Sequence, residues 1–434
     1  MFKRFFKSAK LILSNTTLLR RIAITLLILF VFKLGTFIPV PGVYINYVSD
    51  TIKANDFLGL LNTFSGGGLG NFSILALGIS PYITASIVVQ LLQLVIPKLK
   101  EIANEGETGK KKLNRITRYV SVLLAFVQAL ALLLSLDPTK SGSIFTYEFF
   151  SRPGSLVLCY LFVALVITAG SCFTIWIADL ITQYGIGNGS SLIIGAGIIT
   201  QIPVMILELN TIFLKTEATK SVISYIIILL LYVLIILGVV FLEATVRKIP
   251  VQYANRSGKS DSNIPIKLNT SGVMPVIFAS TIMSIPLTII GLTGSDGKFV
   301  YWLDQTFNTE YPIGMIVYVI LIYVFSFFYA FMQLDPGKVS DNLQKSNAFV
   351  PAVRPGQETE NYISRVLFKV TLIGATYLAV LAMIPIITSK IFDFNSNTIT
   401  IGGTGLLIVV GVAIETMKQL EVQATEQTYS GFIE

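Results

Sequence analysis

Side chains that carry covalent or metal chemistry are scarce in this sequence. The chain contains no histidine, so it offers no Ser-His or Cys-His nucleophile pair and no imidazole metal site. Its two cysteines, Cys159 and Cys172, fall in one apolar stretch, where we expect them to be packing residues. No phosphate-binding GxxxxGK(S/T) loop is present, so nucleotide energy would have to come from a partner. These absences exclude most hydrolytic chemistry.

Isoleucines at similar membrane depth predict a non-covalent device instead. At a rise of about 1.5 Å per helical residue, isoleucines in four apolar segments reach the middle of a bilayer from opposite sides. They are Ile83, Ile87, Ile194, Ile277 and Ile408. A single isoleucine in a membrane helix is ordinarily a packing or lipid-facing residue. Four helices that converge with such side chains predict a hydrophobic constriction, which excludes water and ions by dewetting.

Membrane helices must position these side chains, because the composition is that of an integral membrane protein. The 434 residues are 53% hydrophobic and 13% charged, with a mean hydropathy of +0.74; soluble domains carry about 25% charge. Ten apolar runs approach the roughly 20 residues that cross a bilayer. They cover residues 22–40, 73–96, 117–136, 155–177, 184–207, 221–243, 272–291, 312–334, 366–388 and 401–420. We expect an all-α polytopic protein with ten transmembrane helices.

The charge distribution predicts the orientation. The N-terminal segment, the loops 97–118, 244–271 and 335–365, and Lys418 at the end of the last apolar run together account for 23 of the 32 Lys and Arg residues, against seven in the opposite loops. The positive-inside rule therefore places both termini in the cytoplasm. Residues 1–21 have no cleavage site after the first apolar run; they form either an amphipathic interfacial helix or a simple basic anchor.

Two similar segments predict an internal repeat. GISPYITAS (78–86) and GVMPVIFAS (272–280) share five of nine residues, and a weaker similarity relates GNGSSLI (187–193) to GTGLLIV (403–409). With five spans in each half, equivalent helices run in opposite directions, which is the arrangement of inverted-topology repeats. Chance similarity between apolar segments is the alternative. The expected divisions are the N-terminus 1–21, a first half 22–210, a second half 211–420 and a tail 421–434.

Glycine and proline inside the predicted spans need a physical reason. Gly78, Pro81, Gly272 and Pro275 would break or kink a helix, and freed backbone groups are tolerated at membrane depth only where protein or water covers them. Such helices would line a cavity or an interface; ordinary packing of small residues is the alternative.

The segment 57–71, FLGLLNTFSGGGLGN, does not fit a spanning helix. It is too short to cross and too apolar to lie in water, and its glycines favour a re-entrant element in the external mouth. A simple extracellular loop is the alternative.

Two other functional classes stay open. A secondary transporter also uses repeats and broken helices, but it needs charges at membrane depth, and here they fall close to span ends. These residues are Lys33, Asp179, Glu243, Lys369 and Glu415. An intramembrane hydrolase without histidine would need a Ser-Lys or paired-Asp arrangement, and no pair of acids lies at membrane depth.

Seven motifs across the predicted spans resemble the SecY family of protein-conducting channels. They are GTFIPVPG (35–42), LNTFSGGGLGNFSILALGISPYITASIVVQLL (61–92), YGIGNGSSLIIGAGI (184–198), IPVQYANR (249–256), LNTSGVMPVIFAST (268–281), NAFVPAVRPG (347–356) and IGGTGLLIVV (401–410). The resemblance implies a clamshell of two five-helix halves around a central pore, with a lateral gate between spans two and seven. It also implies a passive conduit, without catalytic residues, metal or cofactor.

The resemblance also implies roles for individual residues. The pore ring would consist of Ile83, Ile87, Ser190, Ile194, Ile277 and Ile408. Ser190 replaces a usual bulky aliphatic residue, which puts a complete ring seal in doubt. The plug, within residues 59–70, would include Leu60, Phe64, Gly66, Gly67, Gly68 and Gly70. Gate residues would be Pro81, Gln128, Asn269, Pro275 and Thr281; Gln128 and Asn269 would alternatively just hydrogen-bond a neighbouring helix.

The implied partners and location follow the same family. The chain would translocate unfolded preproteins across the bacterial cytoplasmic membrane and release signal or transmembrane segments laterally into it. SecE and SecG would be companion membrane subunits, and the SecA motor or the ribosome would dock on the cytoplasmic loops 244–271 and 335–365. The contacts would be Arg247, Lys248, Arg256 and Arg354, although positive-inside bias alone would also supply these cations.

Overall fold

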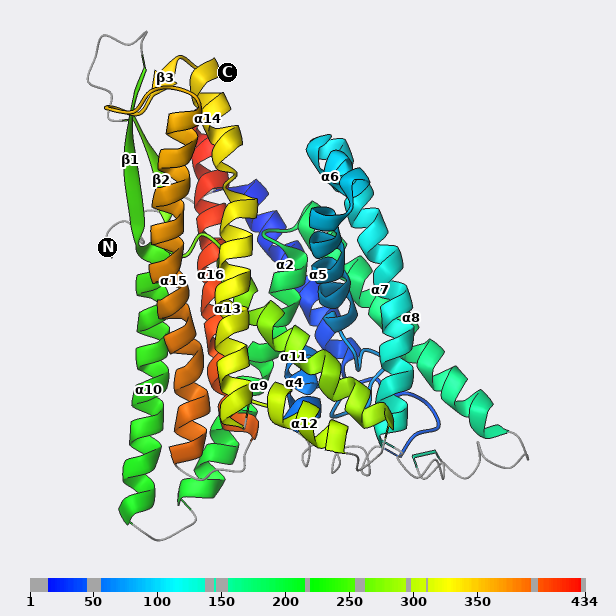
Figure 1. Cartoon of the computed structure of the whole chain (residues 1–434). Coiled ribbons are helices and arrows are strands. Elements are labelled where there is room, and N and C mark those ends of the chain that lie inside the picture. The colour runs from blue at the N-terminus through cyan, green and yellow to red at the C-terminus, as the bar shows by residue number, and fades with distance from the viewer. Residues whose placement is uncertain are drawn as a thin grey trace.

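The chain folds into a set of long helices with a small sheet at one end (Figure 1). The structure, a computed structural model, describes residues 15–44, 56–136, 144–145, 155–214, 219–253, 262–293, 298–309, 311–391 and 397–430. The predicted N-terminal amphipathic stripe and Arg256 lie outside the described residues.

Apolar sequence and local capping determine the helices of the first part of the chain. Asn15 caps the first of them, because its Oδ1 accepts a hydrogen bond from the backbone N–H of Thr17 at 3.1 Å. Prolines lie in the first turn of two further helices, where a backbone N–H has no partner within the helix and its loss breaks no hydrogen bond. The helices are α2 (Thr16–Gly35), α4 (Asp56–Phe64), α5 (Ser80–Val95), α6 (Pro97–Asn104), α7 (Glu107–Leu136), α8 (Ser155–Tyr184) and α9 (Gly189–Leu214). Because α9 continues to Leu214, the predicted division at residue 210 falls inside its last turns.

The second part of the chain contains the remaining helices and the three strands. Asp335 caps α14 through its Oδ1, which accepts from the backbone N–H of Gly337 at 3.1 Å. The helices are α10 (Thr219–Ala244), α11 (Met274–Thr293), α12 (Lys298–Phe307), α13 (Pro312–Gln333), α14 (Pro336–Lys345), α15 (Gln357–Ile391) and α16 (Asn397–Ser430).

A sheet joins the two predicted loops 244–271 and 335–365. Its strands are β1 (Val246–Tyr253), β2 (Ser262–Lys267) and β3 (Ala348–Phe349), in the order β2-β1-β3. β1 pairs antiparallel with both neighbours, with Val246 opposite Lys267 and Tyr253 opposite Ala348. Ile249 and Ile266 turn inward and are at most 2% exposed, so the sheet has a core of its own.

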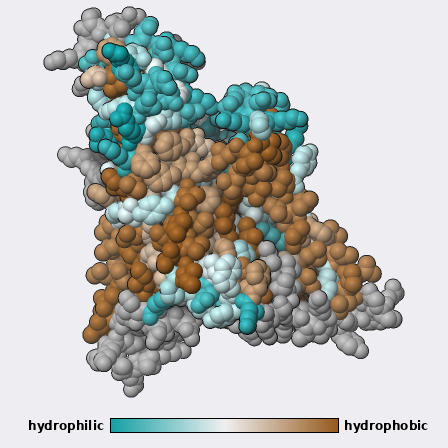
Figure 2. Space-filling model, in the orientation of Figure 1, coloured by the Kyte–Doolittle hydropathy of each residue, from teal (hydrophilic) through white to brown (hydrophobic). Residues whose placement is uncertain are grey.

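The molecule has two chemically different ends. We call the end that carries the sheet, α6 and α14 the loop end, and the end that carries α12 the plug end (Figure 1). Figure 2 shows a hydrophilic surface over the loop end and a broad hydrophobic band below it. Side chains such as Leu237 and Phe241 of α10 are more than 60% exposed in this band. Such a band is the surface that a bilayer solvates.

The described helices confirm an all-α polytopic fold. Candidate membrane spans lie in α7, α8, α9, α10, α13 and α15, which are long and apolar enough to cross a membrane. The pair α5–α6, bent by 103°, is a seventh candidate, and α11 contains a shorter apolar helix, Met274–Pro286. Each of the ten predicted runs overlaps a helix. The count of ten spans stays a prediction.

The glycines of the two similar segments break the chain just before a helix begins, which is one of the two forms that the sequence predicts; they do not kink the helices that follow. Gly78 has φ +53° and lies two residues before α5 begins; Gly272 has φ +64° and lies two residues before α11 begins. Pro81 and Pro275 each take the second position of their helix. Since a positive φ ends the preceding turn and proline fits the first helical turn, both segments specify the same helix start.

Three large hydrophobic cores hold the helices together. One lies within the first part of the chain, mainly among α7, α8 and the segment 69–77. A second lies among α10, α13, α15 and α16. The third contains residues of α2, α4, α5, α8 and α9 together with residues of α11, α13 and α16. This third core therefore joins the first part of the chain to the second.

An aromatic helix marks the plug end. α12 has no buried residue, and Phe299, Tyr301 and Trp302 are 69%, 62% and 57% exposed. The rings of Phe299 and Trp302 stack with centroids 6.4 Å apart. α12 packs against α11 and α13. Aromatic side chains of this kind gather at the membrane–water interface.

Candidate functional site

The five predicted isoleucines come together in the core that joins the two parts of the chain. α5 supplies two of them, and α9, α11 and α16 supply one each. All are between 1% and 6% exposed. We call Ile83, Ile87, Ile194, Ile277 and Ile408 the isoleucine cluster. Their side chains contain no hydrogen-bonding group, so the centre of the molecule is closed by aliphatic packing.

A cavity of about 460 Å³ lies on the loop-end side of the cluster. Ile83, Ile194 and Ile277 contribute to its wall, while the rest of the wall is largely polar. The polar members include Gln90, Asn114, Asp179, Asn188, Ser191 and Gln419. A polar space therefore ends at apolar side chains; their action as a dewetted constriction stays a prediction.

Ser190 lies in the wall of this cavity and outside the isoleucine cluster. It is half-buried and precedes Ile194 by one helical turn on the same face of α9. Its backbone N–H and its hydroxyl both donate to Asn188 Oδ1, at 3.1 and 2.7 Å. Asn188 thus caps the start of α9, and the Ser190 hydroxyl adds a polar group to the wall of the cavity.

The predicted plug is a short helix followed by glycine turns. α4 ends at Phe64, and the backbone turns at Gly66 and Gly67, where φ is +68° and +86°. Phe64 is 8% exposed and belongs to the core that contains the isoleucine cluster. Leu60 lies in α4, but its side chain is outside the described part of the structure. α4 contacts α9 and α16, so this segment is folded into the molecule.

Glycine is required where the plug meets α9. A Cβ built on Gly66 would approach the Cα of Gly197 to 3.0 Å, and one built on Gly197 would approach Gly66 to 3.1 Å. Gly68 is similarly enclosed, because its Cβ would lie 2.9 Å from Ser73 Oγ. Gly70 donates its backbone N–H to Asn62 Oδ1 at 2.7 Å. Two backbones therefore touch directly at Gly66 and Gly197.

Gln128, Asn269 and Thr281 of the predicted gate each form a hydrogen bond with a residue outside that set. Gln128 of α7 donates to Thr84 of α5 at 3.5 Å. Asn269 is 4% exposed and donates to Glu243 of α10 at 2.9 Å. Each amide therefore bonds a neighbouring helix, which is the alternative that the sequence left open. Thr281 donates to the backbone carbonyl of Ile277, and Pro81 and Pro275 are buried at the helix starts.

A contact that sequence reasoning missed joins the two parts of the chain. α11 lies against α5 and α7. The hydroxyl of Tyr329 on α13 donates to Gln90 Oε1 on α5. A glutamine in an otherwise apolar stretch was the available signal, because a polar side chain there needs a partner.

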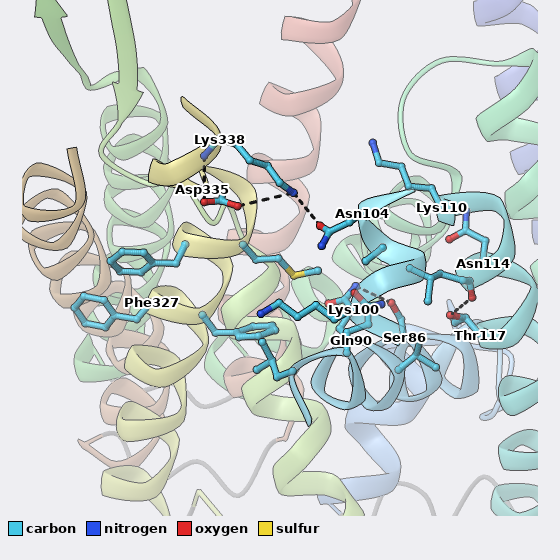
Figure 3. A pocket seen from close by; sticks show the side chains of 18 of the residues that line it. Ser86, Gln90, Lys100, Asn104, Lys110, Asn114, Thr117, Phe327, Asp335 and Lys338 are labelled. Atoms are coloured by element: carbon cyan, nitrogen blue, oxygen red, sulfur yellow. Dashed lines mark hydrogen bonds and ion pairs between the residues drawn. The ribbon is translucent and has the colours of Figure 1, made fainter. Parts of the chain in front are cut away.

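A larger cavity, of about 840 Å³, lies at the loop end of this junction (Figure 3). α5, α6 and α7 form one wall, and α13 and α14 form the other. Lys338 crosses it: its Nζ donates to Asn104 Oδ1 at 3.3 Å and lies 3.8 Å from Asp335 (Figure 3). Lys100 and Lys110 also line the cavity (Figure 3).

Two of the acidic side chains near the span ends are paired with cations. Lys418 Nζ lies 3.4 Å from Glu243 Oε2, and Arg118 Nη2 lies 2.8 Å from Asp179 Oδ2. Among the described residues, no group of three or more His, Cys, Asp or Glu side chains is placed to hold a metal ion. Both cysteines are free thiols on α8.

The predicted docking cations that the structure describes are exposed at the loop end. Arg247 and Lys248 are exposed neighbours near the start of β1, and Arg354 follows β3. The pairing of β1 with β3 links the two loops that carry them.

Fold and site together define a helical membrane protein in which an apolar closure separates a polar cavity from a buried, glycine-hinged helix. The sequence model described as SecY matches residues 73–417, and the chain belongs to the SecY family.

Curated relatives cover almost the whole chain. This chain is 45% identical over 424 residues to protein translocase subunit SecY of Halalkalibacterium halodurans. The alignment covers 95% of this chain and 96% of the relative. The chain is 41% identical over 420 residues to the protein of the same name from Staphylococcus aureus strain NCTC 8325, with the same coverage.

Solved structures share the fold. A protein-conducting channel superposes with a TM-score of 0.63 at 20% identity. A second structure, described as showing that the SecY plug domain stabilises the closed state of the translocation channel and maintains a membrane seal, gives 0.62 at 20% identity. Sec61 in the canine ribosome–channel complex gives 0.60 at 21% identity. Each superposition covers 92% of this chain and 91% of the other.

Proposed function

We propose that this protein is the central subunit of a protein-conducting channel in the bacterial cytoplasmic membrane. It moves unfolded secretory preproteins across the membrane and releases signal or transmembrane segments laterally into the bilayer. Its SecY relatives, which are named translocase subunits, support this proposal. The observation that carries it is the isoleucine cluster, buried between the polar cavity and the plug.

The mechanism is a soft seal that opens and closes without a catalytic step. Aliphatic side chains offer water no hydrogen bond, so a narrow ring of them excludes water and ions. A polypeptide that enters from the cavity replaces the contacts between the isoleucines with contacts to its own side chains. Ser190 supplies a polar step just before the ring on the loop-end side. The plug, residues 59–70, closes the same ring from the other side through Phe64.

Lateral release uses the junction between α5 and α11. Moving from an aqueous pore into lipid stabilises each Leu, Ile, Phe or Val by roughly 0.3–0.6 kcal/mol on the insertion scale. About ten such residues in a signal segment contribute roughly 3–6 kcal/mol. A differential interaction of this size shifts a gate equilibrium of a few kcal/mol. The gate thus responds to the hydrophobicity of the segment that enters it.

Partners supply the driving force. The proposed cytoplasmic loop end presents Arg247, Lys248 and Arg354 to a ribosome or to the SecA motor. Guanidinium and ammonium groups suit ribosomal RNA phosphates, and a ribosome-bound Sec61 shares the fold. SecE and SecG are the proposed companion subunits. Both termini are proposed to lie in the cytoplasm with this end, and the two inverted halves 22–210 and 211–420 form the clamshell.

Planar-bilayer conductance tests the proposal. The purified channel complex is compared with a variant that lacks residues 59–70. We expect the intact channel to stay silent and the deletion to show large, weakly selective openings, because the ring loses the plug packed against it. Silence of both channels, together with solute uptake driven by an ion gradient in proteoliposomes, would instead identify a secondary transporter.

A further inference from the structure

Lys33 is a charged residue in an apolar helix, and its contacts lie on the plug. It belongs to the last turn of α2. Its Nζ donates to the backbone carbonyl oxygen of Gly66 at 2.8 Å and to Thr200 Oγ1 of α9 at 3.2 Å. The ammonium also lies 5.1 Å from the centroid of the Phe37 ring. In the described part of the chain, no ion pair within 4.0 Å involves Lys33.

Both acceptors lie at the point where the plug touches α9. Thr200 donates its own hydroxyl hydrogen to the carbonyl of Gly197 at 2.8 Å, which leaves an oxygen lone pair free to accept from Lys33. Gly197 is the residue whose backbone meets Gly66 directly. One ammonium group therefore joins α2, α9 and the plug turn across a contact that has no side chains of its own.

We infer that Lys33 is the latch that holds the plug in place, an assignment that rests on the proposed function. Gly66 meets Gly197 of α9 backbone to backbone and has no side chain of its own, so a hydrogen bond to its carbonyl oxygen is a direct way to hold this point of the turn. The charge-assisted hydrogen bond from Lys33 is stronger than a neutral one and points at the carbonyl of the turn. When the plug leaves, the ammonium loses this acceptor, so displacement of the plug and release of Lys33 are one event. Lys33 is a positioning residue for the closed state.

Three substitutions isolate the latch. Lys33→Met keeps the length of the side chain, removes both hydrogen bonds and places an apolar residue in an apolar helix, so insertion of α2 is not impaired. Lys33→Arg keeps a cationic donor. Lys298→Met removes an exposed lysine from α12 and serves as the matched control. Lys33→Gln, a shorter neutral donor, is used if the methionine variant gives too little protein.

Conductance of the purified channel complex in planar bilayers reads out the plug. We expect Lys33→Met to raise the open fraction about 10-fold or more, and Lys33→Gln to raise it as well. Lys33→Arg and Lys298→Met should stay within about two-fold of the unmodified channel, because a charge-assisted donor is kept in one and the plug is untouched in the other. In the background that lacks residues 59–70, Lys33→Met should change nothing further, since the two changes act through one element.

The outcomes separate the latch from the proposed function. If the plug deletion opens the channel but Lys33→Met and Lys33→Gln stay silent, the latch is refuted and the channel stands. If Lys33→Met has its full effect in the plug-deleted background, the lysine acts on ion flow directly and the latch is again refuted. If the plug deletion itself is silent, the proposed function fails.

Discussion

The two similar segments of the chain have one backbone conformation and two different surroundings. Gly78 and Gly272 both adopt a positive φ two residues before a helix begins. A Cβ on Gly78 would lie 3.1 Å from the Cα of Ser65, in the plug segment, whereas a Cβ on Gly272 would meet nothing within 4 Å. The first copy therefore lies against the predicted plug segment, and the second begins α11, the proposed gate helix, in open space.

The difference shows which properties the repeat specifies. When the two segments are aligned at their glycines, Ile83 corresponds to Ile277, and both side chains belong to the isoleucine cluster. The next position holds Thr84 in one copy and Phe278 in the other. Thr84 accepts from Gln128, whereas Phe278 packs edge-on against Phe325 with ring centroids 5.9 Å apart. The repeat thus specifies the helix start and the closure, while the remaining positions adapt each copy to its half.

The largest expected effect tests the shared role of the two isoleucines. Ile83→Asn and Ile277→Asn each bury an amide without a built partner, which costs about 1–3 kcal/mol and also lets water enter the ring. We expect both to raise ionic leak through the channel by about 10-fold to 100-fold in planar bilayers.

Ile83→Leu conserves volume and serves as the control, with an expected change well below that of Asn. A leak from only one of the two asparagine variants would show that the two copies are not equivalent in the closure.

A prediction of intermediate size concerns stability and tests whether Gly78 is more constrained by its surroundings than Gly272. Gly78→Ala combines the left-handed strain of about 1–2 kcal/mol with a close contact to the plug backbone, whereas Gly272→Ala carries the strain alone. Thermal inactivation midpoints, measured at one scan rate because membrane proteins often unfold irreversibly, should fall further for Gly78→Ala. Equal midpoints for the two variants would mean that the plug contact at Ser65 does not constrain this position.

The smallest effect tests the contact across the gate. Tyr329→Phe removes the hydrogen bond to Gln90 and should favour separation of α5 from α13 by about 1 kcal/mol, or about five-fold in open fraction. Tyr323→Phe is the matched control, because Tyr323 bonds Thr376 at 2.7 Å inside the second part of the chain. The same conductance measurement reads both, and equal responses would remove the special role of the Gln90 contact.

The apolar runs of the sequence predicted where helices exist more accurately than they predicted where each helix begins and ends. The run 73–96 contains both α5 and the turns before it, in which the N–H of Ala76 bonds Ser73 O and the N–H of Gly78 bonds Leu75 O, each at 2.9 Å. Hydropathy reports burial, and these turns are buried without being helical. The positive φ of Gly78 is the local feature that separates the two, and glycine alone does not reveal its sign.

The apolar part of the site was easier to predict than its polar part. Isoleucines at one depth must meet if their helices converge, so the cluster follows from spacing. Gln128 and Asn269 have several possible partners, and the choice depends on which helix lies beside each of them. Asn269 donates to Glu243 because the buried carboxylate lies next to the amide, and the same carboxylate accepts from Lys418. Such choices are set by tertiary packing and are not written in local sequence.

The exposed aromatic helix α12 gives the protein an optical property. The chain has two tryptophans: Trp176 on α8, beside Phe173, and Trp302 on α12. Indole emission depends on the polarity around the ring, and Trp302 lies on a helix that packs against the gate helix α11. A chain with Trp176→Phe would carry a single tryptophan, on a helix beside the proposed gate, and its emission would report movements there without an attached dye.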